Sequence, residues 1–186
     1  ISLPLLLSGC TPIGDKSTSM SIIYFSTALL SLLLLIGYFI LIRKKNVWFI
    51  FLFSSVFVVN TGYWLLSVCR TLNTALFANR LAYLGSVFLP MAVMMIMLNV
   101  TRTNYKKWFP YLLSSISIVV FLVAASYPYL DIYYKDATLK IVDGVTALCK
   151  TYGILHPLYL VFLLSYFGSM IGVIVHTFKN QKLCSR

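Results

Sequence analysis

The sequence predicts an all-α integral membrane protein, a bundle of five transmembrane helices with a small extracytoplasmic β-hairpin between the fourth and fifth helices. The 186-residue chain is 60% hydrophobic and only 10% charged, whereas soluble domains are about 25% charged. Its charges lie almost entirely between five apolar runs, each close to the ~20 residues that a helix needs to cross a membrane. A single segment satisfies its own backbone polar groups only as a helix. The predicted spans are residues 21–42, 47–69, 82–101, 111–127 and 154–178.

The basic residues predict the orientation of the chain. Nine of them, with no acidic residue among them, follow the first, third and fifth spans: Arg43, Lys44, Lys45, Arg102, Lys106, Lys107, Lys179, Lys182 and Arg186. The segments between the other span ends hold the remaining six basic residues and all four acidic ones. Because cytoplasmic loops are enriched in Lys and Arg, the N-terminus is predicted outside and the C-terminus inside. Short clusters at span ends also argue against a nucleic-acid partner, despite the net charge of +11.

Residues 1–20 are predicted to be an extracytoplasmic leader or an interfacial segment, because their apolar part is too short to span. Residues 7–10 read Leu-Ser-Gly-Cys, which resembles a bacterial lipobox and makes Cys10 a candidate for lipidation. The five spans form one domain over residues 21–178, followed by a basic cytoplasmic tail over residues 179–186.

The third span is preceded by a segment, residues 70–80, whose composition suits a helix, with Thr71 or Asn73 as its N-cap. Within the span, Pro90 removes a backbone donor and is expected to kink the helix. Four methionines follow it at 91, 94, 95 and 97. Since no Cys or His lies beside them, we assign them to packing and predict no metal site.

Small residues mark candidate contact faces on the last two spans. The fourth span carries serines and alanines that permit close helix approach. The fifth span holds Gly168 and Gly172 in a GxxxG pattern, which predicts a packing face toward another helix of the chain or toward a second copy. A homodimer through a transmembrane helix is therefore a candidate assembly.

The outer loop, residues 128–153, is the longest polar stretch. Two β-prone segments flank the pair Asp143-Gly144, a strong signal for a two-residue hairpin turn. The hairpin is expected to lie over the outer helix ends, and the tyrosines at 127, 129, 133 and 134 are expected to form an interfacial aromatic belt. Cys69 and Cys149 both fall on this outer side, where a disulfide between them would be stable; free buried cysteines are the alternative.

Nothing in the sequence resembles a catalytic centre, so we predict no enzymatic activity and no cofactor. The predicted spans contain no carboxylate, and phosphate-binding or hydrolase motifs are absent from the sequence. A few polar and aromatic side chains near the outer ends of the spans are candidates for a ligand site, in which an arginine would suit an anionic group. They are Asn60, Trp64, Arg80, Tyr83, His156 and Tyr159. The alternative is structural: bonds between helices, contacts with lipid headgroups and helix capping.

Two motifs resemble a known family. Residues 78–85 read Ala-Asn-Arg-Leu-Ala-Tyr-Leu-Gly and lead through Pro90 to Asn-Val-Thr-Arg at 99–102. Residues 151–153 read Thr-Tyr-Gly and lead to His-Pro-Leu-Tyr at 156–159. Together they resemble the third helix, outer loop and fifth helix of the seven-span N-terminal sensor region of bacterial histidine kinases and some diguanylate cyclases, over roughly residues 21–182.

The resemblance implies a sensor or input domain in the bacterial cytoplasmic membrane, with lipids and a cytoplasmic output domain as partners. Only five spans are visible, so we expect a fragment of a longer receptor, with two further spans and an output module beyond it. A transporter or channel component is one alternative, and a structural or assembly subunit of a membrane complex is another.

Overall fold

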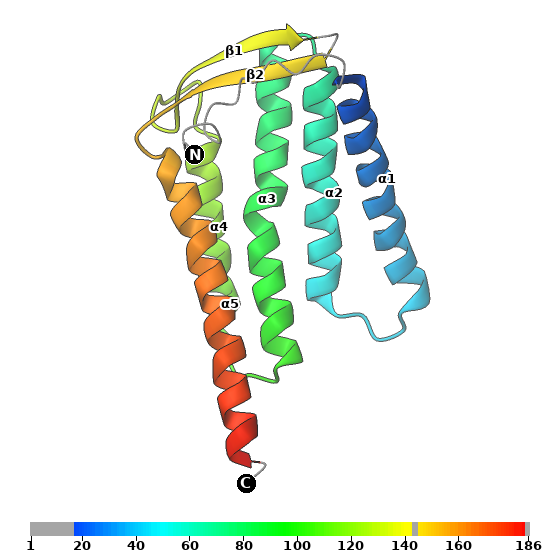
Figure 1. Cartoon of the computed structure of the whole chain (residues 1–186), viewed down its shortest axis with the longest axis vertical. Coiled ribbons are helices and arrows are strands. Elements are labelled where there is room, and N and C mark those ends of the chain that lie inside the picture. The colour runs from blue at the N-terminus through cyan, green and yellow to red at the C-terminus, as the bar shows by residue number, and fades with distance from the viewer. Residues whose placement is uncertain (1–16, 143–144, 185–186) are drawn as a thin grey trace, which may run out of the picture.

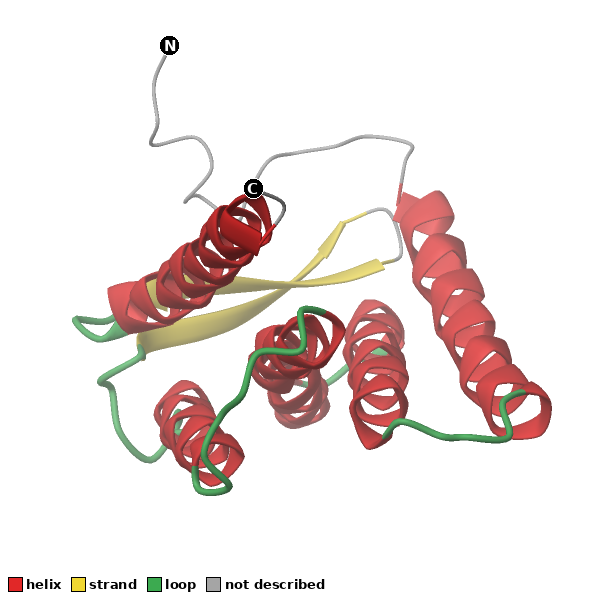
Figure 2. Cartoon of the chain, turned by 90° about the horizontal axis from the view of Figure 1, so that it is seen from below, coloured by secondary structure: helices red, strands yellow, loops and turns green. Residues whose placement is uncertain are grey.

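In the part of the chain that the structure describes, five helices stand side by side and a two-stranded hairpin crosses one end of them (Figure 1). The computed structural model describes residues 17–142 and 145–184. Figure 2 looks along the bundle and shows α1 at one edge and α4 and α5 at the other. The elements are α1 (Ser17–Leu41), α2 (Val47–Val68), α3 (Leu72–Val100), α4 (Phe109–Ala124), β1 (Tyr134–Val142), β2 (Val145–Tyr152) and α5 (His156–Cys184).

Four of these helices are long and apolar enough to cross a membrane, namely α1, α2, α3 and α5. The helix α4 begins two residues before the fourth predicted span, residues 111–127, and ends three residues before the end of that span. It has only 16 residues, about 24 Å of helix, which is less than the ~20 residues that a span needs. Pro110 lies in its first turn, and the helix ends at Ala124, ahead of a turn that contains Pro128. Each apolar run is therefore helical, but only four have the length of a span.

The two ends of the described chain differ from the predicted boundaries. The helix α1 begins at Ser17, so it includes the last residues of the predicted leader. The helix α5 continues to Cys184, so most of the predicted basic tail is helical. The helix continues through residues 179–184 because this segment contains no Gly or Pro that would end it. Cys10 lies outside the described residues.

The helix α3 is the centre of the bundle. Half of its most apolar window is buried, against 11% for α1 and α2 and 17% for α5. It runs without a break from the segment before the predicted span, as the sequence predicted, and Thr71 caps it by accepting a hydrogen bond from the Thr74 amide at 3.3 Å. Pro90 lies buried inside this helix. Of the two predicted N-cap candidates, Thr71 and Asn73, the cap is Thr71.

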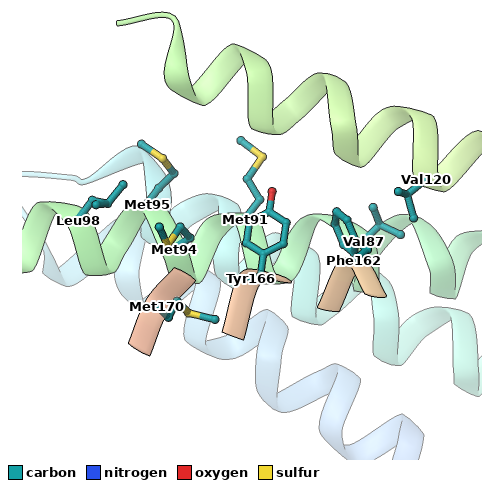
Figure 3. Packing of buried hydrophobic residues seen from close by; sticks show 9 residues of the cluster. All are labelled: Val87, Met91, Met94, Met95, Leu98, Val120, Phe162, Tyr166 and Met170. Atoms are coloured by element: carbon teal, nitrogen blue, oxygen red, sulfur yellow. The ribbon is translucent and has the colours of Figure 1, made fainter. Parts of the chain in front are cut away.

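The methionines of α3 pack in the core, as predicted. Met91, Met94 and Met95 are at most 5% exposed and lie in one cluster with side chains of α4 and α5 (Figure 3). Their flexible thioethers fill the irregular space between three helices. Among the described residues, no group of His, Cys, Asp or Glu is arranged to hold a metal ion.

Two glycines allow α2 and α3 to approach closely. A Cβ on Gly62 would lie 2.7 Å from the Cα of Ala82, and a Cβ on Gly85 would lie 2.5 Å from the Ser55 carbonyl oxygen. Real Cβ atoms do not tolerate such distances, so glycine is required at both positions. The tight crossing therefore depends on two glycines that the sequence analysis did not single out.

The predicted contact face on α5 has no partner in the described chain. A Cβ built on Gly168 or on Gly172 would meet no atom within 4 Å. The GxxxG pattern therefore does not mark a contact within residues 17–142 and 145–184, and packing against a second copy remains a prediction.

The hairpin prediction is confirmed. β1 and β2 pair antiparallel from Tyr134↔Tyr152 to Val142↔Val145, with one irregularity between Tyr134 and Asp136. The two residues that connect the strands, 143 and 144, lie outside the described residues, and so does the predicted turn type.

The predicted Cys69–Cys149 disulfide is wrong. Cys69 is a free thiol whose Sγ donates to the Leu66 carbonyl at 3.1 Å, and Cys149 takes part in a different disulfide. Side chains alternate between the two faces of a strand. Thr146 faces the helices and donates to the Cys69 carbonyl. Cys149, an odd number of positions away, is therefore on the opposite face and does not point toward Cys69.

Candidate functional site: the hairpin cluster

Alternation along β2 presents Thr146, Leu148 and Lys150 to the helices. Leu148 packs against Ala75 and Leu76 at the start of α3. Thr146 and Leu148 are at most 8% exposed. Lys150, the next residue on this face, is therefore brought to a half-buried position against the helices.

Lys150 binds helix α3 directly. Its Nζ donates to the Asn79 side-chain oxygen at 2.6 Å. The same nitrogen lies 5.1 Å from the ring centroid of Tyr134 and 5.7 Å from that of Tyr83, which is within range for cation–π attraction. Burial lowers the pKa of Lys150 from its ordinary 10.5 to about 8. A cation is thus held between the hairpin and α3 by an amide and two aromatic rings.

Two tyrosines before and at the start of β1 complete this contact. Tyr133 and Tyr134 are 1% exposed, and their hydroxyls donate to the Tyr83 hydroxyl at 3.3 and 2.7 Å. Burial raises the pKa of both tyrosines, so they remain protonated donors. The predicted aromatic belt is therefore wrong at these two positions, because the hairpin covers them; Tyr129, at 83% exposed, does face outward.

Arg80 joins α3 to the turn after α4. Its Nη2 donates to the Tyr127 carbonyl at 2.6 Å, and its guanidinium lies 5.8 Å from the ring centroid of Tyr129. Its Nε is buried and has no hydrogen-bond partner. The positive charge is thus oriented by a backbone carbonyl and one aromatic ring.

His156 brings the first turn of α5 into the same region. Its ring stacks on Tyr152 with centroids 3.8 Å apart and lies 5.4 Å from the ring of Tyr133. Its Nδ1 is buried without a hydrogen-bond partner. Tyr159, one turn further along α5, lies 5.6 Å from Tyr83 between ring centroids.

The structure brings four of the six predicted ligand residues together. Asn60 and Trp64 are not among them, because both contact α1. The Asn60 side chain accepts a hydrogen bond from Thr27 at 3.3 Å, and Trp64 lies 5.3 Å from Phe25. Their contacts agree with the structural alternative, a link between two helices.

We call the assembled group the hairpin cluster: Asn79, Arg80, Tyr83, Tyr127, Tyr133, Tyr134, Lys150, Tyr152, His156 and Tyr159. It joins β1, β2, α3 and α5 through side chains. It has two cations and several hydroxyl groups, and Lys150 has an amide as its hydrogen-bond acceptor. Such a region can hold the hairpin in place and can respond to a change of charge.

A comparison with protein families shows the family of this chain. The chain matches, over residues 23–186, the family model described as the N-terminal 7TM region of histidine kinase. The chain belongs to this family. The resemblance inferred from the residues is thereby confirmed, and the chain is a multi-pass membrane protein of the histidine kinase sensor region. The searches of curated proteins and of solved structures found no match.

Sequence reasoning on this histidine kinase region missed Asn79 and Lys150. Both were assigned to polar segments outside the membrane, where charged residues are usually solvated. The alternation Thr146, Leu148, Lys150 was the available signal, since it predicts one face for all three. Asn79 precedes Arg80 within the quoted motif, but nothing in the sequence indicates that the two side chains have different partners.

Proposed function

We propose that the chain is the input domain of a bacterial signal-transduction receptor, in which a signal at the hairpin changes helix packing and reaches a cytoplasmic output domain. The chain itself would carry out no catalysis. Lipids and the output domain would be its partners, and a second copy, contacting through Gly168 and Gly172, would be a further one.

The charge distribution supports the orientation. The loops α1–α2 and α3–α4 and the end of α5 lie at the end of the bundle opposite the hairpin (Figure 1). They carry the basic clusters, beginning with Arg43, Arg102 and Lys179. By the positive-inside rule this end is cytoplasmic, and the hairpin is outside.

The observation that carries the proposal is the contact of Lys150 with Asn79, Tyr83 and Tyr134. A signal can shift a conformational equilibrium only through different interaction energies in the two states. The hairpin meets α3 through a charged hydrogen bond, worth about 1.5–3 kcal/mol, and two cation–π contacts. Displacing Lys150 would therefore remove an interaction energy between the hairpin and α3 that is large enough to alter the position of α3 relative to the hairpin.

The test is a fusion of residues 1–186 to a histidine kinase catalytic domain, with autophosphorylation measured in membrane vesicles. We expect Lys150→Met to change the basal autophosphorylation rate by at least threefold. Lys140→Met is the matched control, because Lys140 is on the same hairpin but exposed, and it should leave the rate unchanged.

Equal rates in both variants, with normal membrane insertion, would contradict the proposal and favour a structural or assembly subunit. Labelling of single cysteines at residue 140 from the outside tests the orientation separately. Ion or solute flux through vesicles that hold the chain would instead favour a channel or transporter.

A further inference from the structure

A cavity lies between α3, α4 and α5, away from the hairpin cluster. Its volume is about 170 Å³, and its wall includes Met94 of α3, Leu113 and Ile116 of α4, and Ser165, Tyr166 and Ser169 of α5. Ile116 is 42% exposed and the two serines are exposed as well, so the cavity opens between α4 and α5. These residues lie on membrane-spanning or apolar helices, so the opening faces the bilayer rather than water.

One wall of this cavity holds a hydroxyl that the protein does not satisfy. Tyr166 is 5% exposed, and its OH is buried with no hydrogen-bond partner. Figure 3 shows the ring rising from α5 beside Met91, with the hydroxyl directed toward α4. Ser117 of α4 is fully buried, and its Oγ lies within hydrogen-bonding range of the Tyr166 hydroxyl, but the geometry of the pair does not complete a hydrogen bond for either group.

Two unsatisfied hydroxyls in an apolar region are costly. A buried polar group without a partner loses its hydrogen bonds to water and gains none in return, and most such groups in folded proteins have a partner. Ser165 and Ser169 do not supply one: their hydroxyls donate to carbonyls of their own helix at 2.7 Å, and neither oxygen accepts a hydrogen bond from the Tyr166 hydroxyl. A ligand that offers one hydrogen-bonding group would remove this cost.

We propose that this cavity binds a small molecule dissolved in the membrane, with an apolar body of about one ring and a single hydrogen-bonding group. The size follows from the volume, since a cavity of about 150 Å³ lined by apolar side chains accommodates benzene. The polar group would contact the hydroxyl of Tyr166, which Ser117 adjoins from behind the cavity wall, and the ring would lie against Met94, Leu113 and Ile116. This site is separate from the hairpin cluster and does not depend on the function proposed for it.

Phenol and toluene are suitable probes, because they have similar shape and only phenol carries a hydroxyl. The full 186-residue chain, labelled with ¹³C at the methionine methyl groups and reconstituted in nanodiscs, reports binding through Met94. We expect a saturable shift of the Met94 signal with both probes, tighter for phenol, and a smaller shift of Met95, which does not line the cavity.

Variants separate the hydroxyl from the cavity. Tyr166→Phe should weaken phenol about 3- to 10-fold, the effect of one hydrogen bond of about 0.5–1.5 kcal/mol, and leave toluene unchanged. Ser117→Ala should act in the same direction and serves if Tyr166→Phe does not fold. Ile116→Trp should block both probes, whereas Ile118→Trp, at an equally exposed position outside the cavity (47% exposed), should block neither.

The absence of a saturable Met94 shift with either probe would overturn the proposal. An equal loss of phenol and toluene binding in folded Tyr166→Phe and Ser117→Ala would also overturn it, since the hydroxyls would then not select the ligand. A shift that survives Ile116→Trp would show that the probes act from the lipid and not from the cavity.

Discussion

Replacing Gly62 by alanine tests the packing of α2 against α3. The new Cβ would lie 2.7 Å from the Ala82 Cα and 2.9 Å from the Ala82 Cβ. Neither atom can rotate away, so the two helices must separate. Overpacking of this kind costs about 1–3 kcal/mol, and backbone atoms in the contact favour the upper end.

The substitution also increases the stability of the helix itself. Alanine is favoured over glycine inside a helix by about 1 kcal/mol. Gly37 on α1 is the matched control, because a Cβ at this position would meet nothing within 4 Å. Gly37→Ala should therefore show only this gain in stability, and Gly62→Ala should be less stable than Gly37→Ala by about 2–3 kcal/mol.

The measurement is equilibrium unfolding of the purified protein in mixed micelles, followed by circular dichroism as the fraction of denaturing detergent rises. Gly85→Ala should behave like Gly62→Ala, since its Cβ would meet the Ser55 carbonyl at 2.5 Å. Equal midpoints for Gly62→Ala and Gly37→Ala would refute the reasoning. Destabilisation by Gly168→Ala would instead indicate that this face packs against a second copy.

Three further outcomes follow from the hairpin cluster. Because the pKa of Lys150 falls from 10.5 to about 8 on folding, the folded protein loses this proton first. The free energy of unfolding should therefore rise between about pH 8 and pH 9.5, by at most about 2 kcal/mol. Lys150→Met should abolish this rise, as measured by equilibrium unfolding at a series of pH values. Arg80→Lys should cost about 1–2 kcal/mol, because lysine cannot keep both the bond to the Tyr127 carbonyl and the ring contact; thermal unfolding checks this, and an unchanged midpoint would contradict it. Tyr134→Phe should cost about 1 kcal/mol by the same measurement, whereas Tyr129→Phe, at an exposed position, should cost nothing measurable.

Most of the bundle was predictable because the membrane constrains it so strongly. Apolar length identified every helix, and the pair Asp143-Gly144 located the hairpin register. The end of α4 was not predictable from hydropathy, since the apolar run continues to Tyr127 while the helix ends at Ala124. The turn beyond it is fixed by Arg80, which binds the Tyr127 carbonyl from another helix.

The site was predictable only in part. Arg80, Tyr83, His156 and Tyr159 were identified because polar groups near span ends are few. Lys150 was missed, since whether a charged residue of a loop is buried depends on which face of the strand meets the helices. The strand face also explains why the predicted Cys69–Cys149 disulfide is wrong. The two cysteines lie at a similar depth along the membrane normal, but Cys149 is on the strand face that points away from Cys69.

The short connection between β2 and α5 has a geometric consequence. The strand ends at Tyr152 and the helix begins at His156. The peptide between them is attached to the preceding segment, because the Gly153 amide donates to the Tyr133 carbonyl at 2.8 Å and the Leu155 amide donates to the Ile132 carbonyl at 3.1 Å. A rigid rotation of the strands would therefore carry the start of α5 with it. This helix has 29 residues, or about 44 Å at 1.5 Å per residue. A tilt of about 5° would thus move its far end sideways by about 4 Å.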